Sequence, residues 1–154
     1  MGVEIERKFL VSSDLWREGA RSMSCEQGYL SFGPPVSVRV RIMGDKATLN
    51  IKQAVTAIER AEFEYAIPVE EARELLDTAC MGSRVQKVRH YVAYADHTWE
   101  VDEFLGDNAG LVVAELELAT VEEEFVKPPW IGEEVSGDPR YLNANLAQTP
   151  FISW

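Results

Sequence analysis

Charged side chains recur at every second position in several short segments, beginning with Glu4, Glu6 and Lys8. Alternate side chains of an extended strand point to the same face, so these three would share one face, opposite Ile5 and Phe9. Six further segments repeat the pattern, with Arg39 and Arg41; Lys52; Arg60, Glu62 and Glu64; Lys87 and Arg89; Glu100 and Asp102; and Glu115 and Glu117. Each segment therefore has one ionic face and one mainly apolar face.

The grouping of charge signs indicates what chemistry these faces could perform. Several pairs are purely acidic or purely basic, and like charges placed close together repel unless an opposite charge lies between them. Carboxylates are the oxygen ligands that Mg²⁺ or Mn²⁺ prefers, and clustered Arg and Lys suit a multiply charged phosphate chain. The pattern leaves two interpretations open. The faces are solvated sides of amphipathic strands, or they point into a barrel and bind a metal–polyphosphate complex.

The elements that must position these residues are mainly β-strands, because the dominant hydrophobic period is two. Turn residues such as Gly44-Asp45 separate the runs. The predicted strands cover residues 3–11, 26–32, 36–43, 46–53, 59–68, 84–95, 97–105 and 111–119. Eight such strands suit a closed antiparallel barrel, which leaves no exposed sheet edge. The fold class is therefore mainly β with some helix (α+β), an eight-stranded tunnel in which residues 1–154 form one domain.

A few helices should accompany the barrel, some packed outside it and one at the C-terminal end. Residues 69–81 carry apolar residues at positions i, i+3, i+4 and i+7, and Gly82 supplies a stop. A second helix is predicted to begin at Thr120, where a glutamate three residues later gives capping-box spacing. The last is predicted to start at Asp138, with Pro139 in its first position.

Composition sets further limits on the function. Hydrophobic residues make up 46% and charged residues 27% of the 154 residues, which is typical of a folded domain. The sequence has neither an apolar run of about 18 residues nor a signal peptide, so we expect a cytoplasmic protein with no membrane partner. A formal net charge of −11 argues against nucleic acid as a partner. Cys25 and Cys80 lack metal-site or redox spacing and are expected to be structural.

Taken in order, the motifs resemble those of the CYTH superfamily, also called triphosphate tunnel metalloenzymes. The resemblance covers nearly the whole chain and begins with the E-x-E-x-K motif at residues 4–8. It continues through VRVRI, ATLNIKQ, RAEFEYAIP, QKVRHYV, WEVDEFLG, LVVAELEL and YLNANLA. The family includes bacterial inorganic triphosphatases, thiamine triphosphatases and class IV adenylate cyclases. Its fold is an eight-stranded antiparallel tunnel with charged side chains pointing inward, which favours the second interpretation of the ionic faces.

The resemblance also implies roles for individual residues. The metal ligands, for Mg²⁺ or Mn²⁺, would be Glu4, Glu6, Glu62, Glu64, Asp102, Glu115 and Glu117. The substrate-binding residues would be Lys8, Arg39, Arg41, Lys52, Arg60, Lys87 and Arg89. The catalytic set would be Glu4, Glu6, Lys8, Lys52 and Tyr29, with Tyr29 coupled to Lys52 or simply buried. Glu100 would ligate a metal or support a ligand, whereas Glu103, His90 and His97 are expected to have no catalytic role.

These residues predict a metal-dependent triphosphatase that cleaves the terminal phosphate of a small linear triphosphate, inorganic triphosphate above all. A chain of this length has little room for a separate domain that recognises a large organic group. A thiamine triphosphatase or a class IV adenylate cyclase on the same fold stays open. The cyclases tend to carry a His-Phe pair upstream of the first motif, which this sequence lacks. A non-catalytic polyphosphate or nucleotide sensor is a further alternative, and a homodimer is possible by resemblance.

Overall fold

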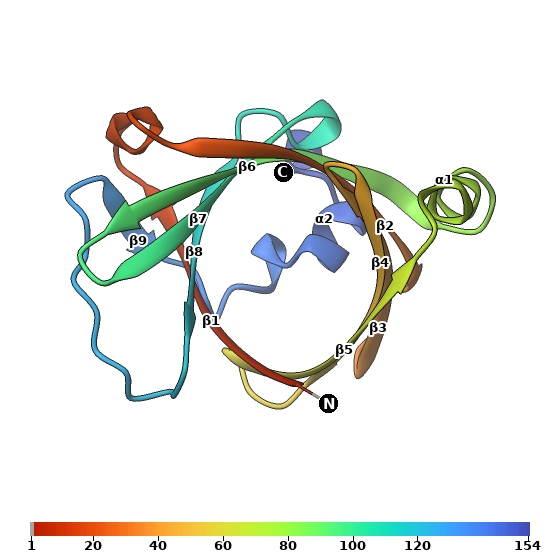
Figure 1. Ribbon diagram of the computed structural model, residues 1–154, viewed down its shortest axis with the longest axis horizontal. Coiled ribbons are helices and arrows are strands. Elements are labelled where there is room, and N and C mark those ends of the chain that lie inside the picture. The colour runs from red at the N-terminus through yellow and green to blue at the C-terminus, as the bar shows by residue number, and fades with distance from the viewer. Residues whose placement is uncertain (1) are drawn as a thin grey trace.

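The structure, a computed structural model, describes residues 2–154 and shows a closed antiparallel barrel (Figure 1). These residues form nine strands: β1 (Gly2–Val11), β2 (Arg21–Ser31), β3 (Val36–Met43), β4 (Lys46–Ala54), β5 (Glu59–Ile67), β6 (Met81–Tyr94), β7 (His97–Phe104), β8 (Val112–Leu118) and β9 (Ile131–Glu134). Their order is β5-β4-β3-β2-β6-β7-β8-β1-β9, and an additional pairing of β5 with β1 closes an eight-stranded ring. The predicted barrel is therefore confirmed, with β9 added beside it.

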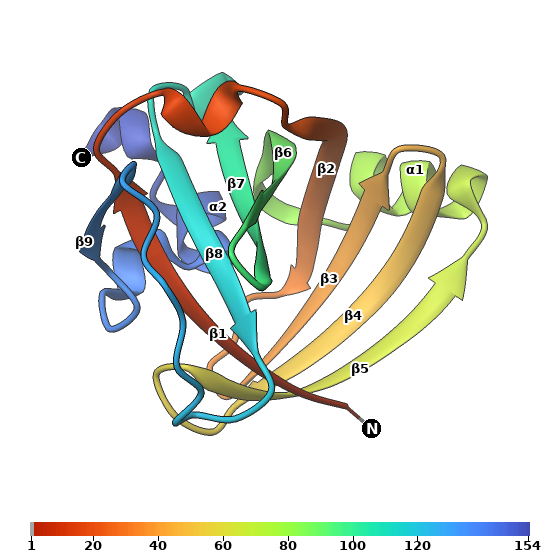
Figure 2. The ribbon, with the colours of Figure 1, turned by 60° about the vertical axis from the view of Figure 1, so that its left-hand side comes forward.

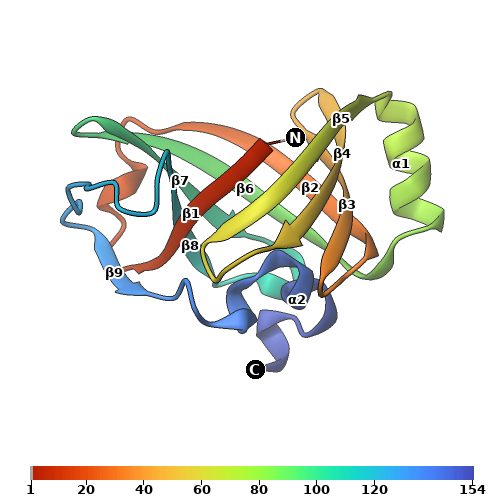
Figure 3. The ribbon, with the colours of Figure 1, turned by 90° about the horizontal axis from the view of Figure 1, so that it is seen from below.

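Strand β1 closes the barrel because its two halves have different neighbours on one edge. Its first half pairs with β5, with Glu4 opposite Arg60, and its last residues pair with β9. Along its other edge β1 pairs with β8, which sets Glu6 opposite Glu117 and Lys8 opposite Glu115. Figure 3 shows β1 and β5 side by side. The first charged motif therefore lies on the strand that joins the two ends of the sheet.

The predicted strand boundaries need two corrections. β2 begins at Arg21 and β6 at Met81, each earlier than predicted, because the two strands pair over a long stretch that brings Arg21 opposite Tyr91. β9 was not predicted, since four residues that include Gly132 carry too little alternation to identify a strand. Gly132 lies against the β1 backbone, where an added Cβ would be 3.1 Å from the Leu10 carbonyl oxygen.

Helix α1 (Val69–Thr78) packs outside the barrel at the far end of β3 and β4 (Figure 2). Ala72 and Leu76 form its buried face. The helix ends three residues earlier than predicted, because the chain enters β6 at Met81. Gly82 is therefore part of β6 and does not end the helix. Gly82 has a positive φ of +67°, and an added Cβ there would lie 2.6 Å from the Ala147 carbonyl oxygen. Gly19 also has a positive φ, of +73°, but no such close contact.

The helix predicted from Thr120 does not form, and that prediction is wrong. The Glu123 carboxylate accepts a hydrogen bond from the Ala119 N–H at 2.7 Å, as at a helix N-terminus, but the chain continues as an irregular segment. Pro128 and Pro129 follow, and proline disfavours the helical conformation of the residue before it. The segment crosses the outer face of the barrel instead (Figure 2).

The C-terminal region begins with a 3₁₀ turn, not with the predicted helix from Asp138. Asp138 accepts a hydrogen bond from the Arg140 N–H and caps a turn over Pro139–Tyr141. Helix α2 follows at Asn143–Gln148. Further 3₁₀ turns occupy Leu15–Arg17, Gly106–Asn108 and Phe151–Ser153. In the view along the barrel, α2 lies within the outline of the ring (Figure 1). None of the helices in residues 2–154 is long and apolar enough to cross a membrane.

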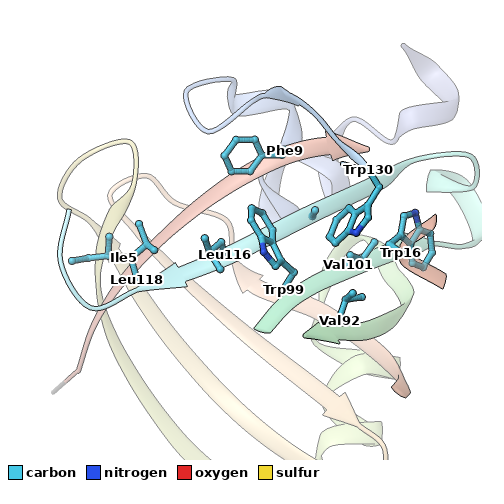
Figure 4. Packing of buried hydrophobic residues seen from close by; sticks show 10 residues of the cluster. Ile5, Phe9, Trp16, Val92, Trp99, Val101, Leu116, Leu118 and Trp130 are labelled. Atoms are coloured by element: carbon cyan, nitrogen blue, oxygen red, sulfur yellow. The ribbon is translucent and has the colours of Figure 1, made fainter. Parts of the chain in front are cut away.

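The apolar side chains divide into clusters on both sides of the barrel wall. The largest lies outside, where Phe9, Trp99 and Leu116 pack against Trp16 and Trp130 from the flanking segments (Figure 4). A second cluster lies under α1. The third fills one end of the interior with inward-facing residues of β2, β6, β7 and β8 packed against α2. The remaining part of the interior is charged, as the ionic strand faces predict.

Candidate active site

A cavity of about 580 Å³ occupies the interior of the barrel. It is lined by residues from both the acidic and the basic predicted sets, together with Tyr29 and Glu100. The lining members of those sets are Glu4, Glu6, Lys8, Arg39, Arg41, Lys52, Arg60, Glu62, Glu64, Arg89, Glu115 and Glu117. Lys87 and Asp102 are the two predicted residues that lie outside this lining. The ionic strand faces therefore point inward, and the interpretation as solvated outer faces is wrong.

The acidic wall of the cavity is built by β1 and β8, which are neighbouring strands. Their pairing brings Glu4 and Glu6 next to Glu115 and Glu117. Burial, reinforced by the charge of Glu115, raises the pKa of Glu6. Burial also raises the pKa of Glu117, with Glu4 and Glu6 adding to the effect. Repulsion between carboxylates therefore contributes on this wall at Glu6 and Glu117. Glu115 differs, because the effect of burial is outweighed there by Lys8 and Arg89, which hold its pKa well below the usual range.

Lysine and arginine side chains supply part of the neutralising charge. Lys52 Nζ donates to both carboxylate oxygens of Glu4 at 3.0 and 3.1 Å. Lys8 Nζ lies 3.7 Å from Glu6 Oε1 and 3.4 Å from Glu115 Oε1. Burial lowers the pKa of Lys8, but the neighbouring Glu115 and Glu6 outweigh it and leave the pKa raised. The pKa of Lys52 is lowered, because burial and the charge of Arg39 exceed the effect of its acidic neighbours.

The basic wall is centred on Arg39 and Arg41 of β3. Both side chains line the cavity, and their Nε atoms are buried without a hydrogen-bond partner in residues 2–154. Burial lowers the pKa of Arg41, and the charge of Arg39 lowers it further. A buried guanidinium is costly unless its N–H groups are satisfied. Neither guanidinium has an ion-pair partner within residues 2–154, and both residues line the cavity, so they suit an anion site.

Glu62 and Glu64 on β5 are held by an amide that the sequence reasoning missed. Asn50 Nδ2 donates to Glu62 Oε1 at 3.3 Å and to Glu64 Oε2 at 3.1 Å. Asn50 is fully buried and accepts in turn from the Thr48 hydroxyl at 2.9 Å. Asn50 has the same strand parity as Lys52, so its inward position was readable from the sequence. Its role was not, because an amide adds nothing to a charge pattern.

Lys87 and Asp102 form a buried layer beside the cavity. Asp102 Oδ2 accepts from Lys87 Nζ at 2.7 Å, and Arg89 donates to both oxygens of Asp102 at 2.8 and 2.9 Å. Burial raises the pKa of Asp102, but Arg89 and Lys87 outweigh it and leave the pKa lowered. Arg89 extends into the cavity lining and also donates to Glu100 at 2.8 Å. Both oxygens of the predicted ligand Asp102 are therefore already taken by protein cations.

Tyr29 lies in the cavity wall, whereas Glu103, His90 and His97 lie outside it. Tyr29 lines the cavity opposite Arg39 on the paired strand, and burial raises the pKa of its phenol despite that charge. In residues 2–154 no hydrogen bond joins Tyr29 to Lys52, which donates to Glu4, so the structure fits the alternative of a buried tyrosine. Glu103 is paired with Arg17 at 2.8 Å, away from the cavity. His90 and His97 each contact one glutamate, also outside the cavity lining.

The donor set of the acidic wall suits a hard divalent cation. Glu4, Glu6, Glu115 and Glu117 offer carboxylate oxygens from two adjacent strands, which is the chemistry that Mg²⁺ and Mn²⁺ prefer. As the side chains stand, no three acidic, His or Cys residues among residues 2–154 converge closely enough to hold a metal ion. Lys52 and Lys8 lie against these carboxylates instead. For these carboxylates to converge on a metal ion, Lys8 and Lys52 would have to give up these contacts.

The fold and the site together define a class of closed antiparallel barrels with one acidic and one basic inner wall. The family model for the CYTH domain matches residues 2–149, and the chain belongs to the CYTH family. The chain is 50% identical over 151 residues to an inorganic triphosphatase of Acetivibrio thermocellus, covering 98% of this chain and 97% of that protein. It is 35% identical over 149 residues to an inorganic triphosphatase of Nitrosomonas europaea, covering 94% and 96%.

Solved structures show the same architecture. The structure of the inorganic triphosphatase NE1496 matches with a TM-score of 0.69 and 34% identity, covering 93% of this chain and 96% of that chain. The PH1012 protein of Pyrococcus horikoshii matches with a TM-score of 0.60 and 21% identity, covering 77% and 79%. At that identity the second match shows only a shared fold. The resemblance seen in the sequence motifs is confirmed.

Proposed function

We propose that the protein is a metal-dependent triphosphatase that hydrolyses inorganic triphosphate inside the barrel. The observation that carries this proposal is the basic wall, where Arg39 and Arg41 present buried, unpartnered Nε atoms beside the cavity. An opposite wall of carboxylates, on which burial raises the pKa of Glu6 and Glu117, complements it. A metal–triphosphate complex would satisfy both walls at once, since the guanidinium groups would hold phosphate oxygens and the carboxylates would hold the metal. Two relatives named inorganic triphosphatases support the same conclusion.

The substrate is gripped by the cations that line the cavity. Arg39 and Arg41 make forked contacts with phosphate oxygens, for which the planar guanidinium is suited. Lys8, Lys52 and Arg60 stand between the basic and acidic walls and act as compact charges on the chain. When a triphosphate enters, Lys52 exchanges Glu4 for phosphate and frees that carboxylate. Their places in the cavity support the roles predicted for these five residues.

The metal ligands are proposed to be Glu4, Glu6, Glu115 and Glu117, with Mg²⁺ or Mn²⁺ as the ion. A bound ion supplies charge neutralisation of the phosphate oxygens and polarises water. Glu62 and Glu64 line the cavity but are held by Asn50, so they are proposed as outer members of the ligand set.

Catalysis is proposed to be mainly electrostatic. A water oxygen attacks the terminal phosphorus, the bond from that phosphorus to the bridging oxygen breaks, and diphosphate leaves with the developing charge. A carboxylate of the acidic wall orients the water. Lys8, between Glu6 and Glu115, fixes the boundary between the two walls. Tyr29 faces Arg39 and helps to position it. The single domain, the cytoplasmic location and the homodimer stay predictions.

One observation favours a second candidate substrate. The cavity has an apolar part, lined by Phe32, Pro34, Pro35, Leu142 and Ala144, which an inorganic triphosphate does not need. Such a surface could hold the organic group of thiamine triphosphate or a nucleotide. The same chemistry at the terminal phosphorus would then act on an organic triphosphate.

A panel of substrates tests the proposal. The protein is incubated with inorganic triphosphate, thiamine triphosphate or ATP in the presence of Mg²⁺ or Mn²⁺, and the products are identified. We expect the highest kcat/KM with inorganic triphosphate, giving one phosphate and one diphosphate. Cyclic AMP from ATP would identify a cyclase and overturn the proposal. Tight binding of triphosphate without turnover would identify a sensor, and a higher kcat/KM with thiamine triphosphate would establish the second candidate.

A further inference from the structure

The buried layer beside the cavity is connected to the C-terminal helix through one amide. Asn143 is the first residue of α2 and lines the cavity. Its Oδ1 accepts hydrogen bonds from Gln27 Nε2 at 2.8 Å and from Lys87 Nζ at 3.1 Å. Lys87 in turn donates to Asp102, whose two oxygens also hold Arg89. A continuous chain of hydrogen bonds therefore runs from α2 to a guanidinium in the cavity wall.

Apolar contacts attach α2 to the barrel in addition to the hydrogen bonds of Asn143. Leu146 and Ala147 of α2 are buried in the apolar cluster at that end of the interior. Ala147 also packs directly over Gly82 of β6, where no larger residue would fit. The helix is thus anchored by its apolar side, while Asn143 directs its carbonyl oxygen at two donors inside the barrel.

The position of Lys87 depends on two acceptors. Its side chain is 1% exposed, and Asp102 and Asn143 are its hydrogen-bond acceptors in residues 2–154. A buried ammonium without full hydrogen bonding is strongly disfavoured, so loss of either acceptor should let Lys87 move. Because Lys87 and Arg89 share Asp102, movement of Lys87 changes how the Arg89 guanidinium is held. Arg89 also contacts Glu100 and Glu115, so the disturbance reaches the acidic wall.

We propose that Asn143 is a positioning residue for the reaction, which fixes Lys87 and, through Asp102, orients Arg89 in the cavity wall. The inference rests on the proposed triphosphatase activity. It assigns the C-terminal helix a task inside the site, in addition to closing one end of the barrel. In this arrangement Lys87 lies behind Asn143, and only Asn143 of the two lines the cavity. This explains why Lys87, although predicted to bind phosphate, is not in the cavity lining.

Four variants separate positioning from helix attachment. Asn143→Leu removes the acceptor for both donors, whereas Asn143→Asp keeps an oxygen at the same place. Gln27→Leu breaks the other hydrogen bond to Asn143 but leaves its contact with Lys87. Gln148→Ala is a control on the exposed side of α2, where the side chain bonds only within the helix.

Kinetics with triphosphate give the first readout. We expect Asn143→Leu to lower kcat/KM about tenfold or more, with both a lower kcat and a higher KM, because Arg89 lines the cavity and is predicted to bind the substrate. Asn143→Asp should recover most of the loss, Gln27→Leu should lose less than about threefold, and Gln148→Ala should match wild type. Equal losses in Asn143→Leu and Gln27→Leu would indicate helix attachment alone. Wild-type kcat/KM in Asn143→Leu would also overturn the proposal.

A second readout does not depend on turnover or on the folding of Asn143→Leu. A buried, hydrogen-bonded ammonium gives a slowly exchanging side-chain NMR signal, which Lys87→Met assigns by its loss. We expect this signal in the wild type, shifted in Asn143→Asp and little changed in Gln27→Leu. A signal that is missing in the wild type, or that Asn143→Asp leaves unshifted, would refute the contact. Failure of the proposed function would appear separately, as wild-type protein that does not hydrolyse any triphosphate of the panel.

Discussion

Two lysine–carboxylate pairs of the barrel interior have the same chemistry but different surroundings. Lys52 and Glu4 line the cavity, with side chains 15% and 13% exposed, whereas Lys87 and Asp102 are 1% and 0% exposed. Asp102 also receives two hydrogen bonds from Arg89, while Glu4 has Lys52 as its ion-pair partner in residues 2–154. We infer that the two pairs have different roles. The cavity pair can exchange partners with ligands, and the buried pair holds the wall that the ligands contact.

The largest expected effect is on stability, when the buried pair is broken. Asp102→Asn removes the carboxylate charge between Lys87 and Arg89 and should lower the free energy of unfolding by about 3–5 kcal/mol. The matched change in the cavity pair, Glu4→Gln, should cost no more than about 1 kcal/mol, because water in the cavity can solvate Lys52. Urea denaturation of both variants measures the difference. Equal losses would show that the two pairs do not differ as proposed.

Activity, unlike stability, should depend more on the cavity pair than on the buried pair. Lys52→Met removes a cation that contacts phosphate in the proposed complex, so kcat/KM for triphosphate should fall about a hundredfold. The free energy of unfolding should change by about 1 kcal/mol or less, since the pair faces the cavity. Steady-state kinetics and urea denaturation are carried out on the same preparation. An active Lys52→Met variant would count against partner exchange at the cavity pair.

Divalent metal should stabilise the folded protein through the carboxylates of the cavity. An ion at the proposed ligands Glu4, Glu6, Glu115 and Glu117 would relieve repulsion between carboxylates, and at ten times its Kd it would add about 1.4 kcal/mol to the free energy of unfolding. Burial raises the pKa of Glu6 and Glu117, and protonated carboxyl groups are poor ligands, so the effect should shrink as the pH falls. Thermal melts with Mn²⁺ or chelator measure it. In Glu115→Gln/Glu117→Gln the metal-induced shift should disappear, and its persistence there would place the ion elsewhere.

The smallest effect is expected on the outer surface of the barrel. Arg7 donates to both carboxylate oxygens of Glu134 at 2.8 and 2.6 Å, which ties β1 to β9. Both side chains are about a third exposed or less, at 28% and 33%. Arg7→Ala should therefore cost about 1 kcal/mol in unfolding and leave kcat/KM unchanged. A large loss of activity would show that β9 influences the cavity.

Strand parity predicted which charged residues share a face, and the resemblance to the tunnel family predicted that this face points inward. Parity grouped Glu4, Lys52 and Arg89 with the other charged residues of their strand faces, and a closed barrel suits eight such strands. It could not place Lys87 and Asp102 behind the cavity, because parity gives the face of a strand but not the depth of a side chain among its neighbours. That depth depends on where α2 packs along the barrel.

The other differences between the predictions and the structure also have physical causes. Asn50, Gln27 and Asn143 are uncharged, so a search for charge patterns passes over them although each makes buried hydrogen bonds. The capping-box spacing at Thr120 indicated a helix, but the later prolines and the packing of this segment on the barrel prevailed. In both cases the deciding contacts join residues far apart in the sequence.

The measurement that tests the central claim most directly is the metal dependence of triphosphate hydrolysis. Wild-type protein is given inorganic triphosphate with Mg²⁺, with Mn²⁺ or with excess chelator, and released phosphate and diphosphate are counted. The two charged walls predict equal amounts of both products with metal and none with chelator. Release that continues undiminished in chelator, or no release under any condition, would contradict the account.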